Sequence, residues 1–357
     1  MKVAVYSISK NEEQFVQRWA ESAKDADMIL LADTGSTDNT VQVAKDLNIS
    51  VVEIEVNPWR FDVARNKSLD AIPQDYDYCI ALDLDEVLVP GWRKHLELMH
   101  ELKVTRPRYK YVWSWNDDGS EGLVYGGDKI HARKYYTWKH PVHEALKPTN
   151  HYEKAVWCDV EIHHHPDSSK PRSQYLPLLK QSVEEDPHDD RNAHYYAREL
   201  LIYGRKEEAL KEFERHLSLP TATWKAERSN SYRYMSMCVT DRAEIESYLF
   251  KAVAEYPEGR EAWVALANHY YLIEDWHGTY FAAKKATAII DKPLHYFNEA
   301  WAWDSFIWDI GSIAAFHLGQ DVEAIEWCEK ALEFLPDDDR ILNNLREFKE
   351  VINGNDN

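Results

Sequence analysis

Asp83 and Asp85 have the spacing of a site for a hard divalent cation. They follow the apolar run Tyr78–Leu82, which reads as a buried strand. Alternate side chains of a strand share a face, so the two carboxylates could address one ligand. Mg²⁺ and Mn²⁺ prefer oxygen ligands and bridge carboxylates to substrate phosphates. An isolated Asp-x-Asp is common in acidic proteins, so this pattern gains its meaning from three further polar clusters.

The three further clusters also follow predicted strands, where parallel sheets bind ligands. They are residues 9–13 (Ser-Lys-Asn-Glu-Glu), 33–38 (Asp-Thr-Gly-Ser-Thr-Asp) and 58–66. Asp33 can accept a hydrogen bond from a base N–H, and the guanidinium of Arg65 suits a diphosphate or a uracil carbonyl. The structural alternatives are capping of the helix at Thr40 for Asp33 and Asp38, and a surface ion pair for Arg65.

The elements that must position these residues alternate between strand and helix. Short apolar runs predict strands at 3–8, 28–32, 50–56 and 78–82, with helices at 12–23, 40–47 and 61–71 between them. This order indicates βαβ units and a mostly parallel sheet. Residues 105–165 then predict a hairpin around the turn Asn116–Gly119 and further strands at 129–133 and 156–162.

From about residue 172 the pattern becomes helical and repeats. Four segments align, at 193–220, 228–257, 262–291 and 306–336, with small residues at expected helix crossings and a proline near the end of most. A spacing of about 34 residues resembles the tetratricopeptide repeat, and residues 340–351 read as the helix that caps the array. We predict two domains, 1–170 and 171–357, the second offering a concave surface for a partner or for a homodimer.

Four motifs in order resemble family 2 glycosyltransferases. They are residues 10–13, 33–38, the run from Trp59 to Asn66, and residues 82–86. The resemblance is closest to the branch with C-terminal tetratricopeptide repeats, related to peptide S-glycosyltransferases of the sublancin type. It implies an α/β GT-A fold, Rossmann-like with a mixed, mostly parallel sheet, followed by an all-α repeat domain. It also implies a nucleoside-diphosphate sugar donor, commonly UDP-linked, and inversion at the anomeric carbon.

Site residues follow from this resemblance motif by motif. Asp33 would bind the uracil, Asp83 would lie near the ribose or sugar, and Asp85 would ligate Mn²⁺ or Mg²⁺, with Asp83 and His143 as further candidate ligands. The full set expected to bind the nucleotide sugar is Ser9, Asn11, Glu12, Asp33, Ser36, Arg65, Asp83 and Arg133.

The segment Lys129–Glu144 resembles the later motif of such enzymes, in which an Arg-x-aromatic element and then Val-His-Glu close the site. We expect His143 to serve the metal or the leaving group and Glu144 to be the general base. Asp117 or Asp118 is the alternative base, although both also suit a simple turn. Here the arginine element reads Arg133-Lys-Tyr, and the three consecutive histidines 163–165 read as packing at a domain junction.

The acceptor is open at this stage. A hydroxyl or thiol of a peptide, protein or glycan fits the repeats. Residues 103–147 hold nine Lys or Arg against five acids, a net +4 in a chain of −20, interleaved with aromatic residues. This stretch could instead bind DNA and present a flipped hydroxymethylated base. The remaining alternative is a non-catalytic repeat scaffold with a degenerate transferase domain.

Composition limits the other function classes. A net charge of −20 argues against non-specific binding to nucleic acid or anionic membranes. The four cysteines are scattered, which favours free thiols in a reducing compartment. The N-terminus does not read as a signal peptide, and no run reaches the ~18 apolar residues of a membrane span. We therefore expect a cytoplasmic enzyme.

Overall fold

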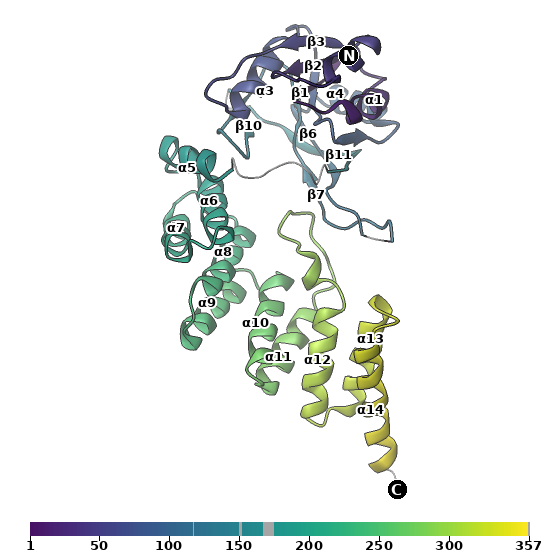
Figure 1. Cartoon of the computed structure of the whole chain (residues 1–357), viewed down its shortest axis with the longest axis vertical. Coiled ribbons are helices and arrows are strands. Elements are labelled where there is room, and N and C mark those ends of the chain that lie inside the picture. Colours follow the sequence, from purple (N-terminus) through teal and green to yellow (C-terminus); the bar gives the residue numbers. More distant parts are fainter. Residues whose placement is uncertain (117, 150–151, 167–174, 356–357) are drawn as a thin grey trace. The chain divides into compact units, whose positions relative to one another are not determined.

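The computed structural model describes residues 1–116, 118–149, 152–166 and 175–355 of the chain (Figure 1). It divides the chain into two compact units, Met1–Glu185 and Asp186–Asn357. The predicted boundary between residues 170 and 171 lies outside the described residues and stays a prediction. No helix in the described ranges is long and apolar enough to cross a membrane.

The main sheet of the first unit has five strands in the order β3-β2-β1-β4-β8. Four of them are parallel, so their carboxyl ends meet at one edge, and β8 runs antiparallel to β4. The strands are β1 (Val3–Ser9), β2 (Met28–Asp33), β3 (Ser50–Glu53), β4 (Tyr78–Ala81) and β8 (Ile130–Ala132). The connecting helices are α1 (Glu13–Ser22), α2 (Thr40–Asp46) and α3 (Phe61–Asp70).

Strand β1 shows why this sheet forms. Alternate residues of a strand point to opposite faces, and both faces of β1 are buried. Val3 and Val5 pack in one hydrophobic cluster with Trp19 of α1, whereas Ala4 and Tyr6 belong to a second cluster. A continuous apolar run is what a parallel sheet covered on both faces requires.

A second, four-stranded sheet completes the first unit, in the order β5-β11-β6-β7. Its strands are β5 (Glu86–Leu88), β6 (Arg106–Val112), β7 (Val124–Gly127) and β11 (Ala155–His164). The antiparallel pairing of β6 with β7 confirms the predicted hairpin. Helix α4 (Trp92–Glu101), the ribbon of β9 (Tyr136–Lys139) and β10 (Ala145–Pro148), and helix α5 (Tyr175–Glu185) make up the remainder.

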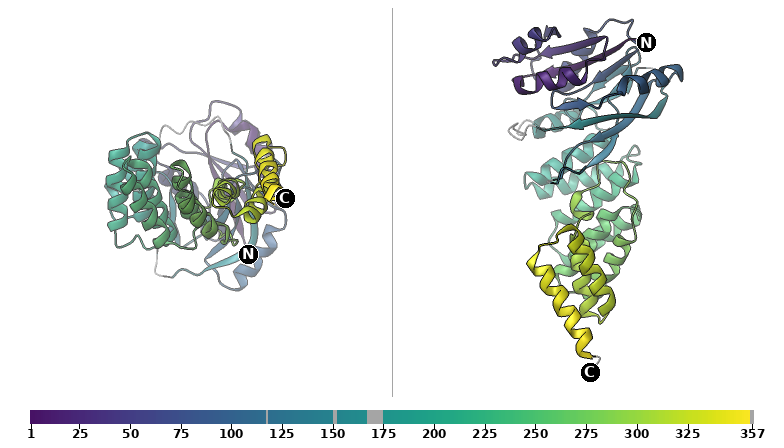
Figure 2. Two further views of the ribbon diagram at one scale, coloured as in Figure 1. Left: turned by 90° about the horizontal axis from the view of Figure 1, so that it is seen from below. Right: turned by 90° about the vertical axis from the view of Figure 1, so that its right-hand side faces the viewer.

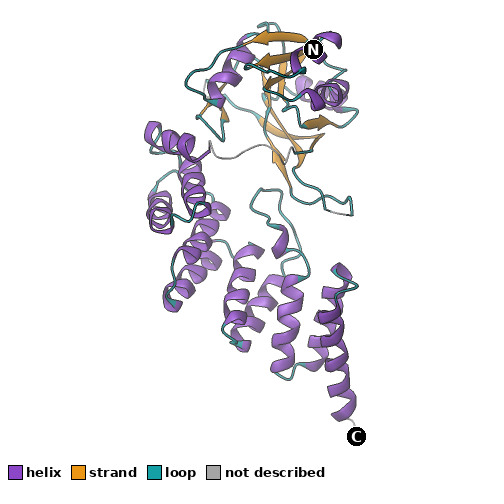
Figure 3. Ribbon diagram, in the orientation of Figure 1, coloured by secondary structure: helices purple, strands orange, loops and turns teal. Residues whose placement is uncertain are grey.

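The second unit is a stack of helix pairs that follow one another in chain order (Figures 2 and 3). Its helices are α6 (Asp190–Ile202), α7 (Lys206–Ser218), α8 (Lys225–Cys238), α9 (Arg242–Glu255), α10 (Arg260–Leu272), α11 (Trp276–Thr287), α12 (Phe306–His317), α13 (Asp321–Phe334) and α14 (Asp339–Asn355), with a 3-10 turn at Ala300–Ala302. The four pairs α6–α7 to α12–α13 coincide with the four predicted repeats. Buried Ile341 and Phe348 of α14 pack on the last pair, which confirms the capping helix. The chain thus combines a GT-A-like α/β unit with a tetratricopeptide-like helical unit.

Candidate active site

The loops that follow β1 and β2 are joined by side-chain hydrogen bonds. The backbone N–H of Asn11 donates to Ser36 Oγ (2.9 Å), and Asn11 Oδ1 accepts from the N–H of Thr37 (2.7 Å). The N–H of Glu12 donates to Thr40 Oγ1 (2.7 Å). The parallel register of β1 and β2 brings these loops to the same edge of the sheet. Two of the predicted clusters therefore form one continuous surface.

The buried carboxylate of Asp33 holds the two loops in place through hydrogen bonds. The carboxylate is buried and accepts hydrogen bonds from Ser9 Oγ (3.1 Å) and from the backbone N–H groups of Gly35 (3.0 Å) and Ser36 (2.9 Å). Gly35 has φ +100°, a left-handed conformation that suits glycine. Asp38, rather than Asp33, accepts from the N–H of Thr40 (3.0 Å) where α2 begins. Contact of Asp33 with a uracil remains a prediction.

Arg65 is the buried centre of the candidate site. Its Nη2 donates to Asp83 Oδ1 (2.8 Å), its Nε donates to Glu144, and its guanidinium lies 5.0 Å from the ring centre of Trp138. The residue is only 5% exposed, so the predicted alternative of a surface ion pair is wrong. Burial lowers the pKa of Arg65, but the two carboxylates raise it further, to well above its usual value. Within the described residues, the buried Nη1 has no hydrogen-bond partner.

Asp83 lies between two cations from different elements. Besides Arg65, it binds Lys129 Nζ through Oδ2 (2.7 Å). Lys129 also donates to Glu86 Oε1 (2.9 Å), and buried Glu86 accepts from Tyr111 Oη (2.7 Å). Burial opposes ionisation of Asp83, but the two cations hold its pKa well below the usual range. Lys129 was not among the predicted site residues, although it lies in the basic stretch and opens the later motif.

Asp85 has different surroundings from Asp83. Strand β4 ends at Ala81, so both aspartates lie in the turn that leads to β5. The prediction that they occupy alternate positions of one strand is therefore wrong. Asp85 Oδ2 lies 3.5 Å from His164 Nε2, and the side chain of each is between a tenth and a sixth exposed. Burial lowers the pKa of His164, but Asp85, the backbone oxygen of Trp113 and the charge of Glu86 together raise it above its usual value.

His164 reaches Asp85 because β11 pairs antiparallel with β5, which places His164 opposite Glu86. Its Nδ1 hydrogen bonds with the backbone oxygen of Trp113 (2.9 Å). The three consecutive histidines 163–165 were predicted to be packing residues at a domain junction. The available signal was that successive residues of a strand point to opposite faces, so His164 and His163 must face different surroundings. The Nε2 atom of His163 lies 2.6 Å from Glu161 Oε1.

The later motif reaches the site through Glu144. The Glu144 carboxylate accepts from Arg65 Nε, which joins the segment after β9 to α3. His143 has φ 49°, and its ring centre lies 5.7 Å from that of Tyr175. The structure thus brings Glu144 to the predicted Arg65 and Asp83, while the ring of His143 contacts Tyr175 of α5.

Arg133 is not brought to this edge. Because β8 is antiparallel to β4, the residue that follows β8 lies beside the start of β4, and the N–H of Arg133 donates to the backbone oxygen of Asp77 (3.1 Å). The buried guanidinium donates twice to the backbone oxygen of Ile72 (3.0 and 2.9 Å). The expectation that Arg133 binds the nucleotide sugar therefore conflicts with its position at the opposite end of the sheet.

The alternative bases, Asp117 and Asp118, follow β6 in the chain. Asp117 is outside the described residues. Asp118 is exposed and accepts hydrogen bonds from the backbone N–H (2.9 Å) and Oγ (2.6 Å) of Ser120. These bonds lower the pKa of Asp118. This is the turn-stabilising arrangement weighed against a catalytic role.

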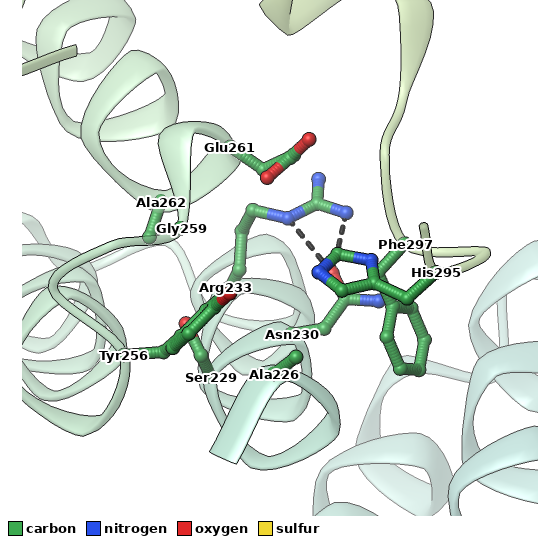
Figure 4. A pocket seen from close by; sticks show the side chains of 10 residues that line it. All are labelled: Ala226, Ser229, Asn230, Arg233, Tyr256, Gly259, Glu261, Ala262, His295 and Phe297. Atoms are coloured by element: carbon green, nitrogen blue, oxygen red, sulfur yellow. Dashed lines mark hydrogen bonds between the residues drawn. The ribbon is translucent and has the colours of Figure 1, made fainter. Parts of the chain in front are cut away.

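The helical unit contains a separate polar pocket (Figure 4). Arg233 donates to Asn230 Oδ1 from Nε (3.0 Å) and Nη2 (2.6 Å), and His295 and Phe297 face this pair from the segment between α11 and α12. Glu261, which accepts from Trp303 Nε1 (2.7 Å), lies on the other side. The lining residues are Ala226, Ser229, Asn230, Arg233, Tyr256, Gly259, Glu261, Ala262, His295 and Phe297. These polar groups largely face one another.

The polar side chains gather at the carboxyl edge of the parallel strands, which is where α/β domains bind their ligands. Residues 5–146 match the model of the family described as glycosyl transferase family 2. The N-terminal unit is therefore a family 2 glycosyltransferase domain, and a tetratricopeptide-like helical unit follows it.

Several known proteins are similar to parts of the chain. An uncharacterized glycosyltransferase of Rickettsia bellii is 34% identical over 97 residues, which is 27% of this chain and 32% of that protein. One of Rickettsia typhi is 33% identical over 97 residues, with the same coverage of both chains. The chain therefore spans about a third of the length of the curated relatives it matches.

Solved structures overlap the chain only partly. The crystal structure of MamA shares 15% sequence identity with this chain at a TM-score of 0.36, and the matched region is 45% of this chain and 86% of the MamA chain. A glucosyl-3-phosphoglycerate synthase of Mycobacterium tuberculosis, solved with Mn²⁺, UDP-glucose and phosphoglyceric acid, shares 24% identity at a TM-score of 0.26. The matched region is 31% of this chain and 44% of the synthase chain.

Proposed function

We propose that this protein is a metal-dependent, inverting glycosyltransferase that uses a nucleoside-diphosphate sugar, with a UDP-sugar as the expected donor. The observation that carries the proposal is the convergence of Arg65, Asp83, Glu144 and Lys129 at the carboxyl edge of a family 2 domain, beside Asp85 and His164. The acceptor supplies a hydroxyl or thiol. The protein is proposed to act in the cytoplasm.

The side chains at this edge fit a divalent cation. Asp85 and His164 offer an oxygen and a nitrogen ligand within one site, a donor set that Mn²⁺ accepts. Arg65 pairs with Asp83 and Glu144, and Lys129 pairs with Asp83 and Glu86, so the ion pairs of these two cations in the described residues involve three carboxylates other than that of Asp85. We therefore assign the metal to Asp85 and His164, with Asp83 held by the two cations. When bound, the ion would supply Lewis-acid stabilisation of the leaving diphosphate.

The donor would lie across the joined loops and the Arg65 cluster. Arg65 keeps one buried Nη1 donor for an oxygen of the diphosphate, and Lys129, with a quarter of its side chain exposed, can turn from Asp83 to the same group. Asn11 and Ser36, on the surface organised by Asp33, are proposed to contact the nucleoside. Positioning and electrostatic stabilisation would be the main contributions to rate.

The transfer step is a single displacement. The acceptor oxygen or sulfur forms a bond to the anomeric carbon as the bond from that carbon to the diphosphate oxygen breaks. The acceptor proton passes to Oε2 of Glu144, while Arg65 holds Oε1. The nucleoside diphosphate leaves with the electron pair of the broken bond.

Part of the basic stretch that suggested a DNA acceptor is engaged within the domain. Arg106 pairs with Asp128 (2.9 Å) and Glu153 (3.1 Å), and Lys110 pairs with Glu121 and Glu161. No observation in the described part of the chain therefore favours nucleic acid over the other acceptors.

The decisive test compares wild type with Asp85→Ala. UDP release from a panel of UDP-sugars is measured with Mn²⁺ and with excess chelator, and Mn²⁺-dependent UDP binding is measured by calorimetry. We expect wild type to bind UDP only with Mn²⁺ and to release it from at least one donor, and Asp85→Ala to lose both. No UDP binding and no turnover by wild type would instead support a repeat scaffold.

A further inference from the structure

Trp113 presents an exposed indole beside the Asp85–His164 pair. It follows β6 directly, and 44% of it is exposed. The indole lies 5.8 Å from the His164 ring, centre to centre, at an interplanar angle of 30°. His164 in turn places Nε2 3.5 Å from Asp85 Oδ2. A single imidazole therefore separates this indole from the carboxylate to which we assign the metal.

The neighbouring Trp115 shows what a structural tryptophan looks like in this loop. Its indole stacks on the His165 ring at 5.9 Å and 5°, and its Nε1 donates to the backbone oxygen of His164 (3.2 Å). Trp113 Nε1, in contrast, has no hydrogen-bond partner among the residues that the structure describes. An aromatic ring with an exposed face and an available N–H is suited to a ligand that is apolar on one side and polar at its rim.

We propose that Trp113 is the stacking surface for the acceptor and that the stacked group is a pyranose ring, so that the acceptor is a glycan. This rests on the proposed function. The negative face of an indole attracts the weakly positive C–H groups on one face of a pyranose, and Nε1 can donate to a ring hydroxyl. Contact with His164 puts this ring at the metal end of the donor, where the sugar is transferred.

Other acceptors fit this surface less well. A nucleobase could stack on Trp113, but its phosphates would need cations, and Arg106 and Lys110 are already paired with acids. A peptide would bring a flat ring only through an aromatic side chain. A pyranose needs neither.

The chain offers a matched control. Trp157 of β11 is 43% exposed, nearly the same as Trp113, but no ring contact links it to the site in the described residues. Trp113→Ala, Trp113→Phe and Trp157→Ala are compared with wild type. Transfer is measured from UDP-glucose, UDP-galactose and UDP-N-acetylglucosamine to methyl pyranosides and disaccharides, and to peptides with Ser, Thr or Cys. Hydrolysis of each donor without acceptor is measured in parallel.

We expect Trp113→Ala to raise the acceptor KM about tenfold, Trp113→Phe to recover part of the loss, and Trp157→Ala to match wild type. Trp157→Ala is also expected to leave donor hydrolysis unchanged. An unchanged acceptor KM in Trp113→Ala, a raised donor KM, or transfer to peptides alone would overturn this inference while leaving the transferase intact. A wild type that neither hydrolyses nor transfers would overturn the proposed function itself.

Discussion

Asp83 and Asp85 are two residues apart in the sequence, but the charges around their carboxylates differ. Asp83 has a cation on each carboxylate oxygen, Arg65 on one and Lys129 on the other. Within the described ranges, the Asp85 carboxylate forms its ion pair with the imidazole of His164. A metal ion competes poorly for a carboxylate that two cations already neutralise, so Asp85 is the better ligand. The histidine beside it then becomes the natural second ligand.

This distinction gives a prediction for the histidines of β11. We expect His164→Ala to weaken Mn²⁺-dependent UDP binding at least tenfold, since it removes one of the two proposed ligands. His163→Ala is the matched control, because the His163 ring contacts Glu161 instead. His143→Ala tests the alternative prediction that His143 is a metal ligand. If the metal is bound by Asp85 and His164, this variant should bind UDP as wild type does. Calorimetry measures the binding of UDP to each of the three variants in the presence of Mn²⁺. Equal binding by His164→Ala and wild type would contradict the assignment.

Strand β8 carries a buried histidine that couples folding to pH. His131 is fully buried, and its Nδ1 must donate to the backbone oxygen of Ala132 (3.0 Å), since that oxygen can only accept. Nε2 is then the acceptor for the hydroxyl of Tyr6 (3.1 Å). Burial lowers the pKa of His131 to about 3. The folded protein therefore holds this imidazole neutral.

The sign of the pH effect follows from linkage. The unfolded chain protonates His131 near pH 6.5, and the folded chain near pH 3, so stability falls as the pH decreases between these values. At pH 5.5 the cost is about 1.4 kcal/mol relative to high pH. We expect this share of the acid destabilisation to disappear in His131→Gln, but to persist in His95→Gln, which changes a half-buried histidine of α4. Denaturant unfolding at pH 5.5 and 7.5 measures the difference.

At the scale of the whole molecule, the two units have separate hydrophobic cores. The clusters around Trp19 and Tyr6 belong to the first unit, and those around Ile310 and Phe348 to the second. Units with independent cores need not unfold together. A change that alters the packing of one core should therefore act on one unfolding transition.

Gly311 of α12 allows this to be tested. A Cβ at this position would lie 2.6 and 2.7 Å from ring atoms of Trp327, closer than the packed helices allow. We expect Gly311→Ala to destabilise the helical unit by roughly 1–3 kcal/mol through overpacking. In calorimetry one thermal transition would move down and the other would stay. Equal shifts of all transitions would contradict the independence of the two cores.

The amino-acid sequence by itself determined the order of elements and the residue types at the sheet edge. Apolar runs at strand and helix periods identified the α/β half, the hairpin and the four helix pairs, because burial imposes these periods locally. The polar clusters after β1, β2 and β4 were visible for the same reason, since strand ends are marked by the loss of apolar residues. Hydrogen bonds link Ser9 and Ser36 to Asp33 and link Asn11 to Ser36, while Arg65 pairs with Asp83; the binding roles of these residues stay predictions.

Only the tertiary structure decided which of these side chains meet. Arg133 was lost from the site because β8 runs antiparallel, and His164 entered it because β11 pairs with β5, a contact across more than seventy residues. The separation of Asp83 from Asp85 likewise depends on where β4 ends and on Lys129 arriving from a distant loop. Strand direction and register across long separations leave no local period in the sequence, so residue spacing alone could not reveal them.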